Sequence, residues 1–142
     1  MNDAVTIHAT TVAIRGCAVL LRGESGAGKS DLALRLIDRG AELVADDYTI
    51  ITRDGAQLAA GAPATIAGRM EVRGVGIVDW PYRVIAPVAL SVVLGVENER
   101  MPDARILTLV GIDVPEITID PRWPSAPIKV EWALTHLKEP HA

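Results

Sequence analysis

The chain has 142 residues, of which 49% are hydrophobic and none is Phe, and its formal net charge is −4. This length fits one domain, and we predict a single domain over residues 1–142 with a core of aliphatic side chains. The acidic balance, without a basic stripe, argues against nucleic-acid binding. No apolar run is long enough for a membrane-spanning helix, so we expect no membrane association.

The first residues and the cysteine content indicate the compartment. Residues 1–4 lack the basic and apolar regions of a secretory signal. The single cysteine, Cys17, cannot form an internal disulfide, and its apolar neighbours favour a small buried side chain rather than a catalytic thiol. We therefore predict a cytoplasmic protein.

The first half of the chain reads as short apolar segments around one glycine-rich loop. In order, the pattern predicts one strand or two at 5–14, a buried strand at 17–21, the loop at 23–30, a helix at 30–39 and strands at 43–45, 48–52 and 57–60. Gly40 is expected to end the helix, and Asp54 with Gly55 is typical of a hairpin turn.

The second half is richer in strands. After a break at 61–63, the pattern predicts a short helix at 63–67, a segment of mixed charges and glycines at 70–79, strands at 85–94, 105–110 and 116–119, a proline-rich loop at 121–127 and a helix at 128–138. Trp80, Trp123 and Trp132 are interpreted as packing residues. Many strands with few helices favour an α/β fold with a mixed, strand-rich sheet.

The glycine-rich loop matches the Walker A pattern in full, with the residues Gly23, Glu24, Ser25, Gly26, Ala27, Gly28, Lys29 and Ser30. Its glycines let backbone N–H groups surround phosphate oxygens, and the following helix directs its positive end at the anion. Lys29 is expected to reach the β- and γ-phosphates, and Ser30 to ligate Mg²⁺. The alternative is a chance match, but a strand before the loop and a helix after it favour a site for ATP and Mg²⁺.

Two adjacent carboxylates, Asp46 and Asp47, follow the strand at 43–45. We expect this strand to lie beside the strand that feeds the loop in a parallel sheet, so that its end opens onto the same crevice. One carboxylate is then predicted to hold Mg²⁺ and the other to accept the proton of an attacking hydroxyl. Both can face the site only if the strand ends there, because successive strand side chains alternate. The alternative is a solvated turn.

Two regions of the chain, each matching one signature, resemble the HPr kinase/phosphorylase family. Residues 23–34, 39–40 and 43–47 look like that family's Walker A loop, helix and V-A-D-D strand. Residues 71–79, E-V-R-G-V-G-I-V-D, are similar to its second signature, E-I-R-G-L-G-I-I-D. Generic P-loop proteins lack the second signature, which makes it the more specific match. The resemblance covers roughly residues 5–120.

The resemblance implies transfer of the γ-phosphoryl group of ATP to a serine of HPr, the phosphocarrier of the sugar phosphotransferase system. Many members also remove the group with inorganic phosphate and release pyrophosphate. The implied fold is the nucleotide-binding architecture of PEP carboxykinase, and the implied assembly is a homo-oligomer, a hexamer in the family. A sensor kinase or another regulator is considered as a further partner.

The resemblance also assigns catalytic residues. Asp47 matches the catalytic aspartate, which acts as base in the kinase direction and as acid in reverse, and Lys29 matches the phosphate lysine. His8 matches a histidine close to that aspartate, and Arg73 and Arg100 match active-site arginines. Without the resemblance, His8 would be interpreted as an ordinary histidine on an edge strand.

Three residues match the family's metal site: Ser30, Asp46 and Glu71. Glu71 forms an acidic and basic pair with Arg73 in the second signature, although an ordinary cross-strand pair would read the same way.

The sequence departs from the family pattern in three ways. Full-length members carry a domain before the catalytic one, whereas this chain starts almost at the catalytic domain. Residues 80–83 replace a Gly-Ala-rich loop, and residues 120–124 stand where the family has P-x-R-P-G-R-N. These features look like the short α-proteobacterial form, and they bear on the hexamer, on docking to HPr and on the reverse reaction.

Two other functions are considered. The first is a P-loop kinase for a small metabolite, and the second is a nucleotide-binding regulatory module without transfer activity. The acidic pair and the Glu71–Arg73 pair argue against the second, because binding alone does not require them.

Overall fold

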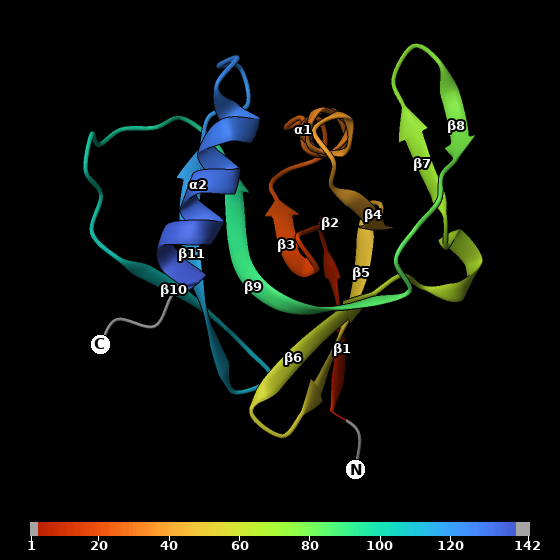
Figure 1. Cartoon of the computed structure of the whole chain (residues 1–142), viewed down its shortest axis with the longest axis horizontal. Coiled ribbons are helices and arrows are strands. Elements are labelled where there is room, and N and C mark those ends of the chain that lie inside the picture. Colours follow the sequence, from red (N-terminus) through yellow and green to blue (C-terminus); the bar gives the residue numbers. More distant parts are fainter. Residues whose placement is uncertain (1–2, 139–142) are drawn as a thin grey trace.

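The computed structural model describes residues 3–138, so positions 1–2 and 139–142 of the predicted domain lie outside the described residues. Its described part contains a curled nine-stranded sheet, two α-helices and a separate two-stranded hairpin (Figure 1). The strands are β1 (Ala4–His8), β2 (Thr10–Ile14), β3 (Cys17–Arg22), β4 (Glu42–Ala45), β5 (Tyr48–Asp54), β6 (Gln57–Gly61), β7 (Arg69–Val72), β8 (Gly76–Asp79), β9 (Ile85–Leu94), β10 (Arg105–Leu109) and β11 (Ile112–Ile119). The helices are α1 (Lys29–Asp38), the 3₁₀ turn η1 (Ala64–Ile66) and α2 (Ala126–Lys138).

The long strand β9 joins the two halves of the sheet. Its first residues pair antiparallel with β6, and its remainder pairs parallel with β3 and with β11. The full order is β1-β5-β6-β9-β3-β2-β4, with β11 on the other side of β9 and β10 beyond it. The predicted mixed, strand-rich α/β fold is confirmed, and residues 5–14 form two strands.

One predicted neighbour relation is wrong. β4 does not lie beside β3, because β2 pairs antiparallel with both and separates them. The reason is local: Arg15 and Gly16 adopt positive φ angles of 49° and 80°, which closes a tight hairpin between β2 and β3 and places β2 on that edge of β3. β3 and β4 still point the same way, so their carboxyl ends meet at one edge.

Three further predictions need correction. The helix expected at 63–67 is only the 3₁₀ turn η1. β11 starts at Ile112, four residues before the predicted strand, and carries Pro115 at a position that pairs with β10 only. Trp123 and Trp132 are 55% and 70% exposed, so they do not pack in the core, whereas Trp80 packs partly against it. Tryptophans alone do not reveal which face of a helix meets the sheet.

Both helices cover one face of the sheet. Leu32 and Leu36 of α1 and Val130 and Leu134 of α2 are buried in one cluster with sheet residues such as Leu21. α1 ends as predicted, with Gly40 at φ 111° and its N–H donating to the carbonyl of Ile37. This packing fixes the N-terminal end of α1 at the edge where β3 ends.

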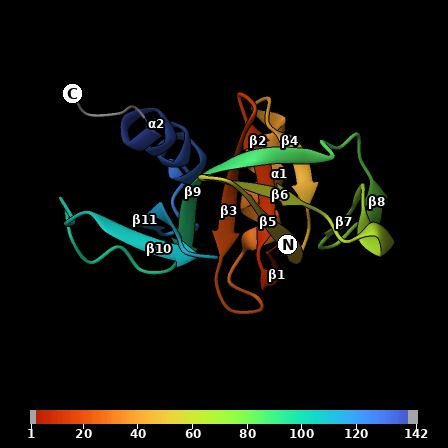
Figure 2. The ribbon, with the colours of Figure 1, turned by 90° about the horizontal axis from the view of Figure 1, so that it is seen from below.

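The opposite face is covered by the sheet itself. β1, β5 and β6 curl over the central strands and enclose a second core that contains Leu20, Val44, Ile51 and Leu58. Figure 2 shows the hairpin of β7 and β8 and the hairpin of β10 and β11 on opposite sides of the central strands. The curl brings the end of β1 to the start of β5, where His8 pairs with Tyr48.

The connection between β11 and α2 contains a buried carboxylate, Asp120, which is 2% exposed. Its oxygens accept hydrogen bonds from Nε and Nη2 of Arg122 and from the Arg122 backbone N–H. These bonds, chiefly those from the guanidinium, lower the pKa of Asp120 from 3.8 to about 2. The stabilisation is therefore complete above about pH 4 and is lost as the pH falls through about 2.

We expect Asp120→Asn to lower the midpoint of thermal unfolding at neutral pH and to flatten its decline between about pH 4 and about pH 2. Thermal unfolding followed by circular dichroism over this pH range measures both effects. Asp103→Asn, at an exposed loop position, is the matched control. Parallel acid profiles for the unaltered chain and Asp120→Asn would contradict the expectation.

Candidate functional site

The glycine-rich loop connects β3 to α1 at the edge where the parallel strands end. Gly26 and Gly28 have φ angles of 84° and 102°, in the left-handed region that favours glycine. The loop closes through a hydrogen bond from the N–H of Ala27 to the carbonyl of Glu24 at 2.9 Å. The loop therefore leads directly into the N-terminal end of α1, and such a helix end favours an anion.

Lys29, the first residue of α1, lies beneath this loop and is 6% exposed. Its ammonium donates to the carbonyls of Gly23 and Glu24, both at 2.9 Å. A buried ammonium requires such partners. The charge is thereby held at the point where the loop turns, and phosphate oxygens bound by the loop would meet it there.

Strand β3 is tied to the sheet immediately before the loop begins. Arg22 donates to Glu116 of β11 at 2.5 Å, and the same carboxylate oxygen accepts from the hydroxyl of Ser91 of β9. This three-strand network was not predicted from the sequence, because its members are far apart along the chain. It fixes the strand end from which the loop starts.

Asp46 is the centre of a hydrogen-bond network that joins three parts of the chain. One oxygen accepts from Ser30 of α1 at 2.8 Å and from Thr10 of β2 at 3.1 Å. The other accepts from the backbone N–H of Glu71 in β7 at 3.0 Å. The Ser30 hydroxyl donates its hydrogen bond to Asp46. The lone pairs of the hydroxyl oxygen therefore remain free to ligate a cation.

The backbone leaves the extended conformation at Asp47, so its side chain does not follow the alternation of a strand. β4 ends at Ala45, and Asp47 has a left-handed φ of 67°. Asp tolerates this conformation better than most residues. The Asp47 carboxylate lies 2.7 Å from Nε2 of His8, the last residue of β1. The strand therefore ends at the point that a two-carboxylate site requires.

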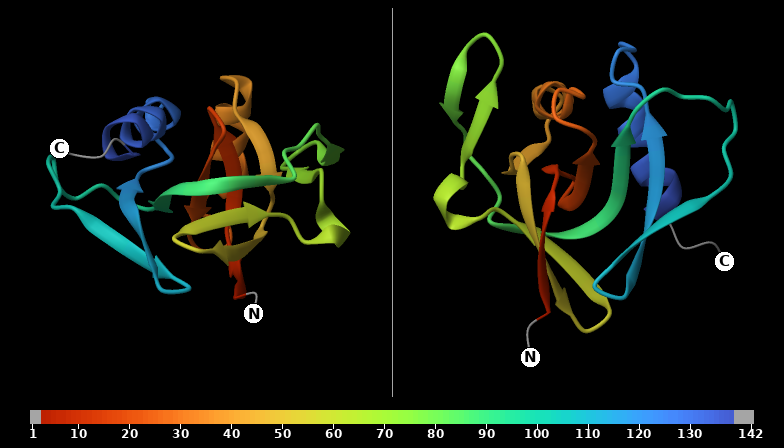
Figure 3. Two further views of the ribbon diagram at one scale, coloured as in Figure 1. Left: turned by 60° about the horizontal axis from the view of Figure 1, so that its bottom comes forward. Right: turned by 180° about the vertical axis from the view of Figure 1, so that it is seen from behind.

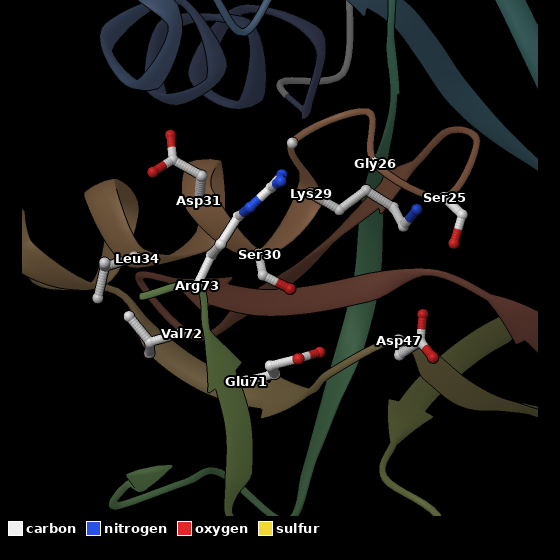
Figure 4. Close-up of a pocket in the computed structure, with 11 residues that line it drawn as sticks. Ser25, Gly26, Lys29, Ser30, Asp31, Leu34, Asp47, Glu71, Val72 and Arg73 are labelled. Carbon is white, nitrogen blue, oxygen red and sulfur yellow. The ribbon is translucent and has the colours of Figure 1, made fainter. Parts of the chain in front are cut away.

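The hairpin of β7 and β8 forms the other wall of the site. Figure 3 shows it standing beside α1, and the buried side chain of Met70 packs it against the core. Glu71 and Arg73 project from it, and Figure 4 shows the Arg73 side chain extending toward the N-terminal end of α1. The hydrogen bond from Glu71 N–H to Asp46 links this wall directly to the acidic pair.

Together these elements enclose an open cavity of about 420 Å³, within the range of small-ligand sites. It is lined by Ser25, Gly26, Gly28, Lys29, Ser30, Asp31, Leu34, Asp47, Glu71, Val72 and Arg73 (Figure 4). Residues from three stretches of the chain, within 25–34, at Asp47 and at 71–73, thus converge on one space, which contains the cationic groups of Lys29 and Arg73 and the carboxylates of Asp31, Asp47 and Glu71.

The predicted residues do not all meet at this cavity. Lys29, Ser30, Asp47, Glu71 and Arg73 line it, whereas Asp46 and His8 do not: Asp46 contacts the cavity residue Ser30, and His8 contacts the cavity residue Asp47. Arg100 does not line the cavity: it is exposed in the loop that joins β9 to β10. Figure 3 shows that this loop and the hairpin of β7 and β8 lie on opposite sides of the molecule. Thr10, which contacts both aspartates, was missed, because a threonine in a β-branched run reads as an ordinary strand residue.

The described residues contain no group of three or more His, Cys, Asp and Glu arranged to hold a metal. Separately, neither described helix is both long and apolar enough to cross a membrane.

A Walker-type loop between a buried parallel strand and a helix, facing an acidic strand end, defines a P-loop nucleotide-binding α/β domain. The family profile described as HPr Serine kinase C-terminal domain matches residues 1–82. The structure of the HPr(Ser) kinase/phosphatase from Coxiella burnetii superimposes with a TM-score of 0.80 at 32% identity, over 93% of this chain and 95% of that one. The chain therefore belongs to the HPr serine kinase C-terminal domain family, and the resemblance predicted from the sequence is confirmed.

Curated relatives agree. The HPr kinase/phosphorylase of Chlorobium luteolum is 38% identical over 138 residues, and that of Clostridium acetobutylicum is 40% identical over 120 residues. These matches cover 87% and 80% of this chain but only 41% and 38% of the relatives. The chain thus spans about two fifths of the length of the curated relatives it matches.

Proposed function

We propose that this protein is an ATP- and Mg²⁺-dependent protein serine kinase that phosphorylates the phosphocarrier HPr. The observation that carries the proposal is the pairing of His8 with Asp47, which lines the same cavity as the phosphate loop. A nucleotide-binding module needs the loop alone. A carboxylate held by a histidine across from the loop supplies the group that activates a hydroxyl acceptor.

The phosphate loop and Lys29 would bind the triphosphate of ATP. Ser30, with Asp46 behind it, would hold Mg²⁺, and Glu71, which lines the same cavity, would complete the site. Bound there, the cation supplies charge neutralisation at the β- and γ-phosphate oxygens. The three hydrogen bonds that Asp46 already accepts favour a role in orienting Ser30, which would ligate the cation.

Asp47 would act as the general base. Its carboxylate would accept the proton of the serine hydroxyl as the serine oxygen bonds to the γ-phosphorus and the bond to the β-phosphate oxygen breaks. His8 would orient that carboxylate through the 2.7 Å contact. Arg73 would balance the negative charge that spreads over the transferring group. Arg73 is better placed for this task than Arg100, because it lines the cavity.

The reverse reaction is part of the proposal. Inorganic phosphate would attack the phosphorus of phosphoserine, pyrophosphate would form, and Asp47 would return its proton to the serine oxygen. The relatives named HPr kinase/phosphorylase support this direction. A cytoplasmic location, assembly into a homo-oligomer and control by an upstream regulator complete the proposal.

The experiment is a comparison of acceptors at fixed ATP and Mg²⁺. We expect ADP release to depend on HPr and to remain at background with a pool of small metabolites. ADP release with the metabolite pool alone would favour a small-metabolite kinase, and tight ATP binding without ADP release in either mixture would favour a regulatory module. Adding inorganic phosphate and phosphorylated HPr, and assaying pyrophosphate, tests the reverse direction.

A further inference from the structure

Three threonines lie fully buried where β2 and β5 meet: Thr10, Thr11 and Thr49. A buried hydroxyl requires hydrogen-bond partners. Thr11 and Thr49 meet each other at 2.8 Å, and Thr49 donates to the carbonyl of Ala9. The partners of Thr10 are different, because both belong to the acidic pair.

The Thr10 hydroxyl bridges the two aspartates. It donates to the Asp46 carboxylate at 3.1 Å and accepts from the Asp47 backbone N–H, also at 3.1 Å. A hydroxyl has one proton and two lone pairs, so both bonds can exist together. One side chain thus holds the carboxylate of one residue and the backbone of the next.

The second bond fixes an unusual backbone conformation. Asp47 has a φ of 67°, and the following N–H, that of Tyr48, donates to the carbonyl of Asp46 at 2.7 Å. The Asp47 N–H points toward β2, where Thr10 is its hydrogen-bond acceptor. Without that acceptor the N–H would lose its partner, and the left-handed turn that aims Asp47 at the cavity would lose a restraint.

We propose that Thr10 is a positioning residue that sets both aspartates of the site, Asp46 through its carboxylate and Asp47 through its backbone. The proposal rests on the proposed function for its catalytic consequence, since Thr10 does not line the cavity and acts only through its two neighbours. The role requires a hydroxyl group at the first position of β2, which Thr10 occupies. It does not require the methyl group of Thr10.

Three substitutions separate this role from ordinary packing. Thr10→Val keeps the shape and removes the hydroxyl, whereas Thr10→Ser keeps the hydroxyl and removes the methyl group. Thr11→Val is the matched control: it removes a buried hydroxyl from the same strand, while Thr49 keeps its bond to Ala9. Thermal unfolding of all three variants confirms that they are folded at the assay temperature.

With HPr as acceptor, Thr10→Val is expected to lower kcat about 10- to 100-fold, because a small misplacement of a catalytic group is enough for such a loss. The KM for ATP should stay within about threefold, because the phosphate loop is untouched. Thr10→Ser and Thr11→Val should keep both constants within about threefold of the unaltered protein. An unchanged kcat in Thr10→Val, or an equal loss in Thr11→Val, would overturn the proposal.

A second measurement decides the proposal without any acceptor. Amide hydrogen exchange at Asp47, followed by NMR, should be about tenfold or more faster in Thr10→Val than in Thr10→Ser or Thr11→Val. Equal exchange rates in the three variants would overturn the inference. If the unaltered protein does not phosphorylate HPr, the proposed function fails, and the exchange rates still support or overturn the role of Thr10.

Discussion

Asp47→Asn is expected to lower the rate of phosphoryl transfer to HPr about a thousandfold, the scale of a lost general base, while leaving ATP affinity within about twofold. Asparagine has nearly the same shape as aspartate and also tolerates the left-handed conformation that residue 47 adopts at φ 67°. The geometry should therefore persist, and only the ability to accept a proton is removed. His8 would keep a hydrogen-bond partner at the 2.7 Å contact.

The measurements are single-turnover transfer to HPr and equilibrium binding of a fluorescent ATP analogue. Asp54→Asn is the matched control, because Asp54 ends β5 at the exposed turn away from the cavity. Its transfer rate should equal that of the unaltered protein. Transfer by Asp47→Asn within about tenfold of the unaltered rate would show that Asp47 is not the base.

Lys29→Met should weaken ATP binding on the order of a hundredfold, since each hydrogen bond to a charged group contributes about 1.5–3 kcal/mol. Methionine retains the length and apolar body of the side chain and removes the charge. In the present structure the ammonium is satisfied by the carbonyls of Gly23 and Glu24, so the substitution also frees these two acceptors. Loss of the charge should weaken ATP affinity. It should also lower kcat, because the ammonium would stabilise the transferring phosphoryl group.

A lysine in α2, Lys129, provides the control. Lys129 pairs with Glu97 at 2.8 Å, outside the cavity, and Lys129→Met should leave ATP affinity unchanged. Titration calorimetry with ATP and Mg²⁺ measures both variants, and thermal unfolding checks that each is folded. ATP affinity in Lys29→Met equal to that of the unaltered chain would contradict the assignment of the loop.

Features encoded by neighbouring residues were predictable from the sequence. The phosphate loop, α1 with its end at Gly40, and the end of β4 before Asp46 all follow from local pattern and turn chemistry. The family resemblance added His8, whose partner lies 39 positions away and which no local pattern connects to Asp47.

Features that depend on pairing between distant segments were not predictable. The tight turn at Arg15 and Gly16 puts β2 between β3 and β4, so the acidic strand end reaches the loop from one strand further away. Thr10 became recognisable only once β2 was known to lie beside β4. The exposure of Trp132 depends on which face of α2 meets the sheet, and Ala126, Val130 and Leu134 occupy that face.

The most direct test of the proposed kinase activity is to locate the transferred phosphoryl group. Purified protein is incubated with γ-labelled ATP, Mg²⁺ and HPr, and the labelled peptide of HPr is identified by mass spectrometry. We expect label on one serine of HPr, lost in the Asp47→Asn variant and retained in Asp54→Asn. Unlabelled HPr in a mixture where the protein binds ATP, or label that persists in Asp47→Asn, would contradict it.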